Sequence, residues 1–185
     1  MLKSASGSRR RCSQNIARSR RILRQVTDRL WAPWRAELFQ KPKEEGCVFC
    51  TLPAEGAAHD EENLILHRGN ACFVILNKFP YSAGHLMVIP FVHTDDMAKL
   101  AMTAQESYAL ADRSMAALRA VMNAEGFNLG MNLGKVAGAG VPGHGHLHVV
   151  LRWNGDNNFL PALADRRVIS EGLSEAWHRL KPHFA

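Results

Sequence analysis

Three histidines alternate with small or apolar residues in the stretch His144-Gly145-His146-Leu147-His148-Val149-Val150. Successive side chains of a β-strand point to opposite faces, so this pattern predicts a strand with the three imidazoles in a row on one face. Neighbouring members of such a row are about 7 Å apart along the strand. A single histidine in a strand is usually structural, but three in alternation indicate a site that uses imidazole chemistry.

The segment directly before these histidines is rich in glycine and reads Ala-Gly-Ala-Gly-Val-Pro-Gly over residues 137–143. Glycine permits positive φ and lets backbone N–H groups come close to an anion. Alone, such a loop is weak evidence for phosphate binding. Because it leads into the three histidines, we expect Gly138 and Gly140 to contact phosphate groups.

Chain length and composition favour a single globular domain. A chain of 185 residues can bury a substantial core without disulfide support. Its apolar runs are all shorter than the roughly 18 to 20 residues that a membrane-spanning helix requires, so we expect no membrane association. Its four cysteines do not suggest the disulfide framework of a small secreted protein, and we expect a cytoplasmic location.

Hydrophobic periodicity predicts an α+β protein. A long amphipathic helix is expected to begin at a capping box formed by Thr103 and Glu106 and to end at Gly126. A second helix is expected at the C-terminus, over residues 170–180. Strands are expected on both sides of the long helix, at residues 71–76, 85–89, 127–133 and 145–151. This order is typical of an antiparallel sheet with helices packed against it, and residues 28–62 are expected to be irregular.

The three histidines resemble the signature of the histidine triad (HIT) family of nucleotidyl hydrolases and transferases, His-x-His-x-His followed by two apolar residues. Further similar segments are residues 77–80, 84–90 and 132–134. Residues 31–35 and 152–159 look like the branch that contains bacterial diadenosine tetraphosphate phosphorylases. The resemblance covers about residues 30 to 160. It implies an antiparallel sheet with helices against it, paired as a homodimer.

The resemblance assigns roles to the three histidines. A neutral imidazole is a competent nucleophile near pH 7. In the family the middle histidine attacks the α-phosphate, which gives His146 this role and implies a nucleotidyl-histidine intermediate. His148 would donate hydrogen bonds to the same phosphate, and His144 completes the catalytic group. A related uridylyltransferase branch has Gln at the third position, so His148 argues against that branch.

The resemblance also implies contacts to the nucleotide. Asn77 matches a residue that binds a ribose hydroxyl, and Asn132 matches one near the phosphates. The alternatives are that Asn77 shapes a turn and that Asn132 satisfies groups at the sheet edge. Trp31, Trp34 and Trp153 are candidates for stacking on a purine or for core packing.

The chain departs from the family pattern at one place in the glycine-rich segment. Many members have Gln, Ser or Thr a few residues before the first histidine, where the side chain can reach the leaving oxygen. This chain has Gly140-Val141-Pro142 and one extra residue. The group that assists the leaving phosphate is therefore open.

The pair Cys47 and Cys50, with two distant histidines, fits a structural tetrahedral Zn²⁺ site. In zinc-bearing family members the third ligand follows the Val-Ile-Pro strand and the fourth is the first triad histidine, which implies His93 and His144 here. His59 is a rival third ligand because it is nearer to Cys50 in sequence. The alternative is that the two thiols are free and that His144 only forms hydrogen bonds.

The positive charge of the chain is concentrated at its N-terminus. The net charge is +6, but residues 1–27 hold eight of the 23 Lys and Arg residues and no acid, which leaves 15 basic and 17 acidic residues in 28–185. We expect residues 1–27 to be a disordered basic extension and residues 28–185 to be the catalytic domain. The extension is compatible with a transit peptide, an arm that binds polyanions such as nucleic acid, or an over-long gene model.

The function expected from these residues is cleavage of dinucleoside polyphosphates, with inorganic phosphate or water as the acceptor. The resemblance at residues 153–159 favours a diadenosine tetraphosphate phosphorylase. The alternatives are a nucleoside phosphoramidate hydrolase and a nucleotide-binding regulatory protein without turnover. A protein interaction module held together by zinc is a further alternative.

Overall fold

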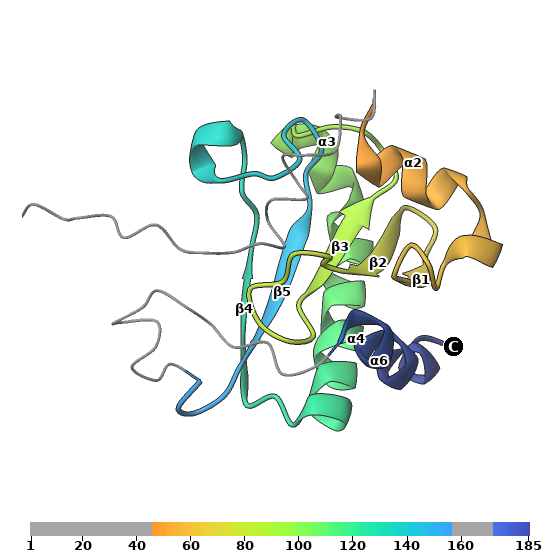
Figure 1. Cartoon of the computed structure of the whole chain (residues 1–185). Coiled ribbons are helices and arrows are strands. Elements are labelled where there is room, and N and C mark those ends of the chain that lie inside the picture. Colours follow the sequence, from red (N-terminus) through yellow and green to blue (C-terminus); the bar gives the residue numbers. More distant parts are fainter. Residues whose placement is uncertain (1–45, 157–171) are drawn as a thin grey trace, which may run out of the picture. The chain divides into compact units, whose positions relative to one another are not determined.

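A five-stranded antiparallel sheet forms the centre of the computed structural model, which describes residues 46–156 and 172–185 (Figure 1). The strand order across the sheet is β1-β2-β3-β5-β4. The strands are β1 (Ile65–Arg68), β2 (Cys72–Leu76), β3 (Leu86–Pro90), β4 (Gly126–Gly130) and β5 (Leu147–Arg152). The predicted α+β class with an antiparallel sheet is confirmed.

The four predicted strands are present, each with shifted ends. The largest consequence is at β5, which begins at Leu147, so that His144 and His146 lie in the extended segment that leads into the strand. Strand β1 was not predicted. It has only four residues, and its pairing with β2 shifts between Ile65 and His67, so its sequence shows little alternation.

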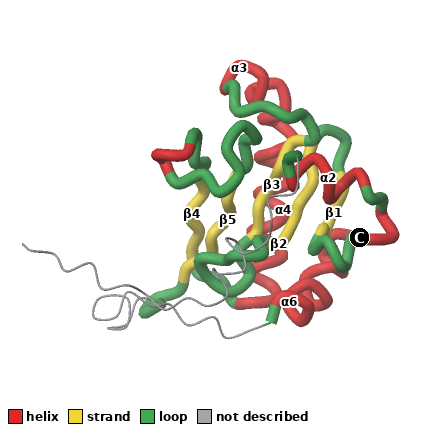
Figure 2. Tube along the Cα trace, turned by 45° about the horizontal axis from the view of Figure 1, so that its top comes forward, coloured by secondary structure: helices red, strands yellow, loops and turns green. Residues whose placement is uncertain are grey.

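Helices cover one face of the sheet. The long helix α4 (Ala104–Met122) packs against β2, β3 and β5, and α6 (Leu173–Leu180) packs beside it (Figures 1 and 2). This face holds the larger apolar core, to which alternate residues of the central strands contribute. The core includes Leu86, Val88, Leu147, Val149, Leu118, Trp177 and Leu180. Both predicted helices are confirmed, although residues 170 and 171 lie outside the described part of the chain.

The opposite face of the sheet is covered by a short helix, α2 (Val48–Ala54), followed by a 3-10 turn at Ala57–His59. The prediction that residues 28–62 are irregular was therefore wrong for residues 48–59, while residues 28–45 lie outside the described part of the chain. Helix α2 has only seven residues and contains Pro53. Proline is unfavourable inside helices, so the sequence did not indicate a helix here. Phe49 of α2 joins Phe73, Ile75, Met87 and Ile89 in a second apolar cluster.

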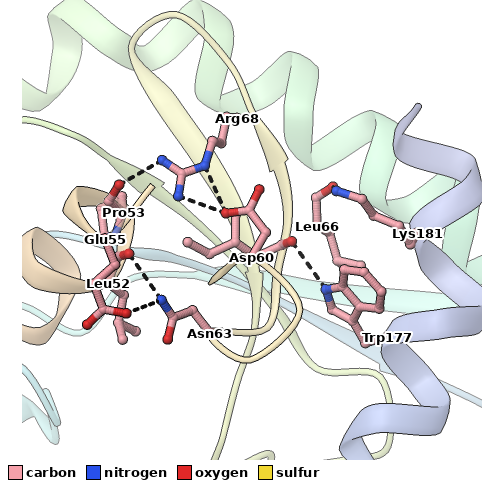
Figure 3. Close-up of polar contacts among 10 residues, drawn as sticks. Leu52, Pro53, Glu55, Asp60, Asn63, Leu66, Arg68, Trp177 and Lys181 are labelled. Atoms are coloured by element: carbon pink, nitrogen blue, oxygen red, sulfur yellow. Dashed lines mark hydrogen bonds and ion pairs between the residues drawn. The ribbon is translucent and has the colours of Figure 1, made fainter. Parts of the chain in front are cut away.

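Polar contacts attach α2 to strand β1 (Figure 3). The Arg68 guanidinium donates from Nε and from one terminal nitrogen to Asp60 Oδ1, at 2.9 and 2.7 Å. Its other terminal nitrogen donates to the carbonyl oxygen of Pro53 at 2.8 Å. Asn63 adds hydrogen bonds to Leu52 O and to Glu55. This branched guanidinium fixes the end of α2 relative to the sheet, and α2 is the helix that carries Cys50.

The predicted capping box at the start of α4 was wrong. The Thr103 hydroxyl donates backwards to Leu100 O at 2.9 Å instead of capping the helix. The Glu106 carboxylate accepts from the backbone N–H groups of Asn70 and Ala71 at 2.6 and 2.8 Å, in the turn before β2. A tertiary contact therefore took the carboxylate that the local pattern assigned to the helix end.

No helix in residues 46–156 or 172–185 is long and apolar enough to cross a bilayer. The predicted boundary after residue 27, and the predictions for Trp31 and Trp34, lie outside the described residues.

Replacing Glu106 should destabilise the fold. Glu106→Ala leaves two backbone donors without their charged acceptor, which should lower the free energy of unfolding by about 1–3 kcal/mol in urea denaturation. Glu106→Gln keeps one acceptor oxygen and should lose less. The exposed neighbour Gln105 provides the control, and equal stability of Glu106→Ala and Gln105→Ala would show that the contact contributes nothing.

Candidate active site

Strand β5 divides its side chains between the two faces of the sheet. Leu147, Val149 and Leu151 enter the core beneath α4. His146 and His148 take the other face, with their ring centroids 4.8 Å apart, and His148 pairs with Met87 of β3. The three triad histidines are all buried. The structure therefore places the imidazoles on the face that α2 partly covers.

Gly145, between the first two histidines, is required by close packing. A Cβ at this position would lie 2.7 Å from Leu100 Cδ1. The Gly145 N–H donates to Thr94 O at 2.7 Å, which joins the segment before β5 to the loop after β3. The backbone that carries the histidines is thus held from both sides.

His146 has the hydrogen bonding expected of a nucleophile. Its Nδ1 lies 2.8 Å from the carbonyl oxygen of His144. A carbonyl can only accept, so Nδ1 carries the proton and Nε2 keeps its lone pair. Burial lowers the pKa of His146, against the hydrogen bond to the carbonyl, which raises it. The imidazole is therefore neutral near pH 7, with Nε2 available for attack.

His148 is oriented by a fourth histidine, His85, which precedes β3. The backbone N–H of Tyr81 donates to His85 Nδ1 at 3.1 Å, and the Asn77 amide nitrogen lies 3.2 Å from the same atom. The His85 proton is therefore on Nε2, which donates to His148 Nδ1 at 3.0 Å. This leaves a proton on His148 Nε2, the one buried side-chain nitrogen or oxygen without a partner in the described part of the chain. An unpartnered buried donor beside His146 suits an anionic oxygen such as that of a phosphate.

Both members of the His85–His148 pair are held neutral. Burial, and then the neighbouring imidazoles of His148 and His146, lower the pKa of His85 to about 3. Burial, and then His146, lower the pKa of His148 to about 4. The sequence analysis placed His85 only at the start of the strand expected over residues 85–89. Its position directly before β3, in a segment similar to the family, was the signal that could have placed it in the site.

Four side chains that could hold a metal ion lie together at the other end of the imidazole row. The potential ligand atoms of Cys47, Cys50, His93 and His144 are all within 4.8 Å of one another. His144 Nε2 donates to Pro90 O at 2.8 Å, which leaves the lone pair of Nδ1 facing Cys47 Sγ at 3.3 Å and Cys50 Sγ at 3.6 Å. Two thiols and two imidazoles suit a tetrahedral ion such as Zn²⁺, and the Pro90 carbonyl would fix the ligand ring.

The rival ligand His59 lies elsewhere, in the 3-10 turn after α2. Its Nδ1 is 3.5 Å from the Glu62 carboxylate. By contrast, His93 Nδ1 is 3.4 Å from Cys50 Sγ. The geometry favours His93 as the third ligand.

His144 connects the Cys47, Cys50, His93 and His144 cluster to His146. Its side chain faces the thiols, and its carbonyl oxygen accepts the His146 Nδ1 proton. Phe49, between the two cysteines in sequence, contacts both rings, with centroid distances of 5.6 Å to His144 and 5.0 Å to His146. The position of the His146 imidazole therefore depends directly on the order of this cluster.

The remaining described residues predicted to contact the nucleotide lie in the loops around the sheet. Asn77 Oδ1 accepts from Phe79 N–H at 2.9 Å, so the side chain takes part in the turn, and its expected contact with a ribose hydroxyl stays a prediction. The Gly138 N–H donates to Lys135 O within the loop, and Gly140 is exposed. Asn132 is half-buried and follows β4. Trp153 donates from Nε1 to Met122 O and packs against the core, which favours a packing role.

Comparison with known proteins agrees with this geometry. A model of the HIT domain matches residues 59–155. The chain is 32% identical to the AP-4-A phosphorylase of Mycobacterium tuberculosis over 169 residues, which is 88% of this chain and 87% of that protein. It is 28% identical to an uncharacterised HIT-like protein of Saccharolobus solfataricus over 130 residues, 70% of this chain and 90% of the relative.

The fold is also similar to solved structures. A zinc-bound histidine triad family protein from Mycobacterium smegmatis superposes with a TM-score of 0.57 at 30% identity, covering 75% of this chain and 93% of that one. The chain belongs to the HIT family, as the resemblance of its triad predicted.

Replacing His85 should change how stability depends on pH. Because the pKa of His85 is lowered to about 3, the unfolded chain binds a proton that the folded chain does not, from its ordinary pKa of about 6.5 downwards. The folded state therefore loses stability as the pH falls through this window. His85→Gln should remove up to about 1.4 kcal/mol per pH unit of this loss, measured by urea denaturation between about pH 7 and pH 5.

The control for this measurement is Gln105→Ala, because Gln105 is an exposed residue of α4 that carries no titratable group. This variant should retain the wild-type slope. An identical slope in His85→Gln and wild type would contradict the assignment of His85 as a buried neutral imidazole.

Proposed function

We propose that the protein cleaves dinucleoside polyphosphates by nucleotidyl transfer through His146, with inorganic phosphate as the favoured acceptor. The observation that carries the proposal is the neutral His146, whose proton is held on Nδ1, beside the unpartnered N–H of His148. The similarity to a protein named AP-4-A phosphorylase, over most of both chains, supports the substrate class.

In the first step, His146 Nε2 attacks the α-phosphorus. A P–N bond forms, the P–O bond to the remaining polyphosphate breaks, and that polyphosphate leaves with the bonding electron pair. The imidazole becomes positively charged, and the carbonyl oxygen of His144 stabilises its Nδ1 proton. The N–H of His148, which is buried without a partner, would donate to a non-bridging oxygen of the same phosphate.

In the second step, an oxygen of inorganic phosphate attacks the nucleotidyl group and the P–N bond breaks. His146 returns to its neutral form with the Nδ1 proton in place. From diadenosine tetraphosphate this sequence yields ATP in the first step and ADP in the second. Water in place of phosphate would yield AMP in the second step, which defines a hydrolase.

Product analysis with diadenosine tetraphosphate tests the function. With phosphate present, we expect ADP and ATP, and His146→Ala should abolish turnover while nucleotide affinity stays within about tenfold, because the imidazole forms its bond only in the reaction. His178→Ala, which changes an exposed histidine far along the chain, is the matched control and should keep wild-type turnover.

Other outcomes would change the assignment. AMP and ATP without phosphate dependence would establish a hydrolase. Substantial turnover in His146→Ala would refute the nucleophile. No products in either condition would favour a nucleoside phosphoramidate hydrolase, and lack of turnover there as well would favour a nucleotide-binding role.

We further propose that Cys47, Cys50, His93 and His144 bind one structural Zn²⁺ per chain. The grouping of the four ligand atoms supports this site, as does the likeness to a solved protein described as zinc-bound. Bound zinc would hold His144, and with it the carbonyl that orients His146. The metal would therefore stabilise the site and take no part in bond making.

Metal analysis after dialysis should find about one zinc per chain. Cys50→Ser and His93→Ala should each lose most of it, because each removes one of four ligands. His59→Ala, the matched control at the rival position, should retain it. Well under one zinc per chain in the wild type would contradict the proposal.

A homodimer is also proposed, on the family resemblance. Strand β4 lies at the edge of the sheet with Asn128, Leu129 and Gly130 exposed, and an exposed edge strand can pair with a second chain.

A further inference from the structure

The aromatic ring of Tyr81 lies against His85 and His148, the pair in which His85 orients the proposed phosphate donor His148. Its centroid is 4.8 Å from that of His85 and 5.7 Å from that of His148, with the planes tilted by 30° and 39°. Tyr81 is 40% exposed, whereas His85 is fully buried and His148 is 8% exposed. The ring therefore covers the imidazole pair on a side that faces solvent.

The direction of the His85–His148 hydrogen bond depends on both imidazoles being neutral. The groups that face the pair are the imidazole of His146 on the β5 side and Tyr81 and Asn77 in the loop before His85. No carboxylate in the described residues forms an ion pair with either ring. A second proton on either imidazole would therefore have no opposite charge to balance it.

Protonation of His85 would also break the hydrogen-bond pattern. It would place a proton on Nδ1, the atom that faces the Tyr81 N–H and the Asn77 amide nitrogen. The two N–H donors of Tyr81 and Asn77 would then face a third N–H donor on His85, and the imidazole would have to rotate or move. His148 would lose the neighbour that keeps its own proton on Nε2.

We propose that Tyr81 is a positioning residue, whose ring excludes water from the His85–His148 pair and so keeps His148 Nε2–H directed at the substrate phosphate. The effect of Tyr81 on turnover rests on the proposed function. The effect of Tyr81 on the protonation of His148 does not rest on it, and can be observed without any substrate.

Side-chain substitutions isolate this role, because they leave the Tyr81 backbone N–H in place. Tyr81→Phe keeps the ring and removes only the hydroxyl. Tyr81→Ala removes the cover, and Tyr81→Leu replaces it with a smaller aliphatic side chain that leaves part of the imidazole pair uncovered. Tyr108, the other tyrosine of the chain, is exposed on α4 and gives the matched control, Tyr108→Ala.

The first measurement is the protonation state of His148 in full-length, ¹⁵N-histidine-labelled protein by NMR at about pH 6. The wild-type pKa, lowered to about 4 by burial, leaves the ring neutral with its proton on Nε2. In Tyr81→Ala, water reaches the pair, the pKa rises towards its ordinary value of about 6.5, and a substantial protonated fraction should appear. Tyr81→Phe and Tyr108→Ala should match the wild type.

The second measurement is the kinetics of diadenosine tetraphosphate cleavage. Tyr81→Ala should lower kcat by about tenfold or more with KM changed by less than about threefold, because the donor acts on the transition state. Tyr81→Phe should stay within about threefold of the wild type. If Tyr81→Ala does not fold, Tyr81→Leu should show the same two effects in weaker form.

An unchanged His148 signal in Tyr81→Ala, or in Tyr81→Leu if the alanine variant is unfolded, would overturn the proposal. A loss of kcat in Tyr81→Phe equal to that in Tyr81→Ala would also overturn it, since the hydroxyl would then be the active group. A wild type that cleaves no dinucleoside polyphosphate would sink the proposed function alone, because the NMR result would still decide the role of Tyr81.

Discussion

The hydrogen bond from His146 Nδ1 to the carbonyl oxygen of His144, at 2.8 Å, is the interaction on which the site depends. It determines which nitrogen of His146 has a free lone pair, and in the proposed reaction it would give the imidazole an acceptor for its proton as positive charge develops. The acceptor belongs to the backbone, so its position depends on everything that holds residue 144. That residue is held by Pro90 O on one side of its ring and faces the two thiols on the other.

The supports of His144 come from distant parts of the chain. Cys47 and Cys50 are positioned by α2, and α2 is attached to β1 through Arg68 and its contacts with Asp60 and Pro53 (Figure 3). The two ends of the imidazole row therefore differ. One end is ordered by a cluster suited to a metal ion, and the other by a chain of neutral imidazoles from His85 to His148.

Burial of the histidines away from water keeps their imidazoles neutral. Burial is the largest cause of the lowered pKa of His85, His144, His146 and His148. A neutral imidazole can donate from one nitrogen and accept at the other, so neighbouring neutral rings can form a hydrogen bond. Protonated rings would instead repel each other at centroid separations near 5 Å. The apolar packing of Leu147 and Val149 beneath α4 holds the strand that brings these rings together.

The sequence alone determined the main strands and helices and most of the residues of the candidate site. Alternation in β5 and in the extended segment before it predicted that His146 and His148 lie on one face, because the period of an extended chain is a local property of the backbone. The long helix and the sheet strands followed from hydrophobic periodicity for the same reason. Family resemblance in the triad and in the cysteine pair named the four residues that the structure groups together.

The tertiary structure decided the features that depend on distant partners. The Glu106 carboxylate fitted a local capping pattern, yet it binds two backbone N–H groups 35 and 36 residues away, because those donors would otherwise be unpaired. The choice between His59 and His93 was open in the sequence and depended on which loop reaches Cys50. The role of His85 and the cover provided by Tyr81 arise only when β3 and β5 pair, since hydrogen-bond direction and exclusion of water are properties of the assembled fold.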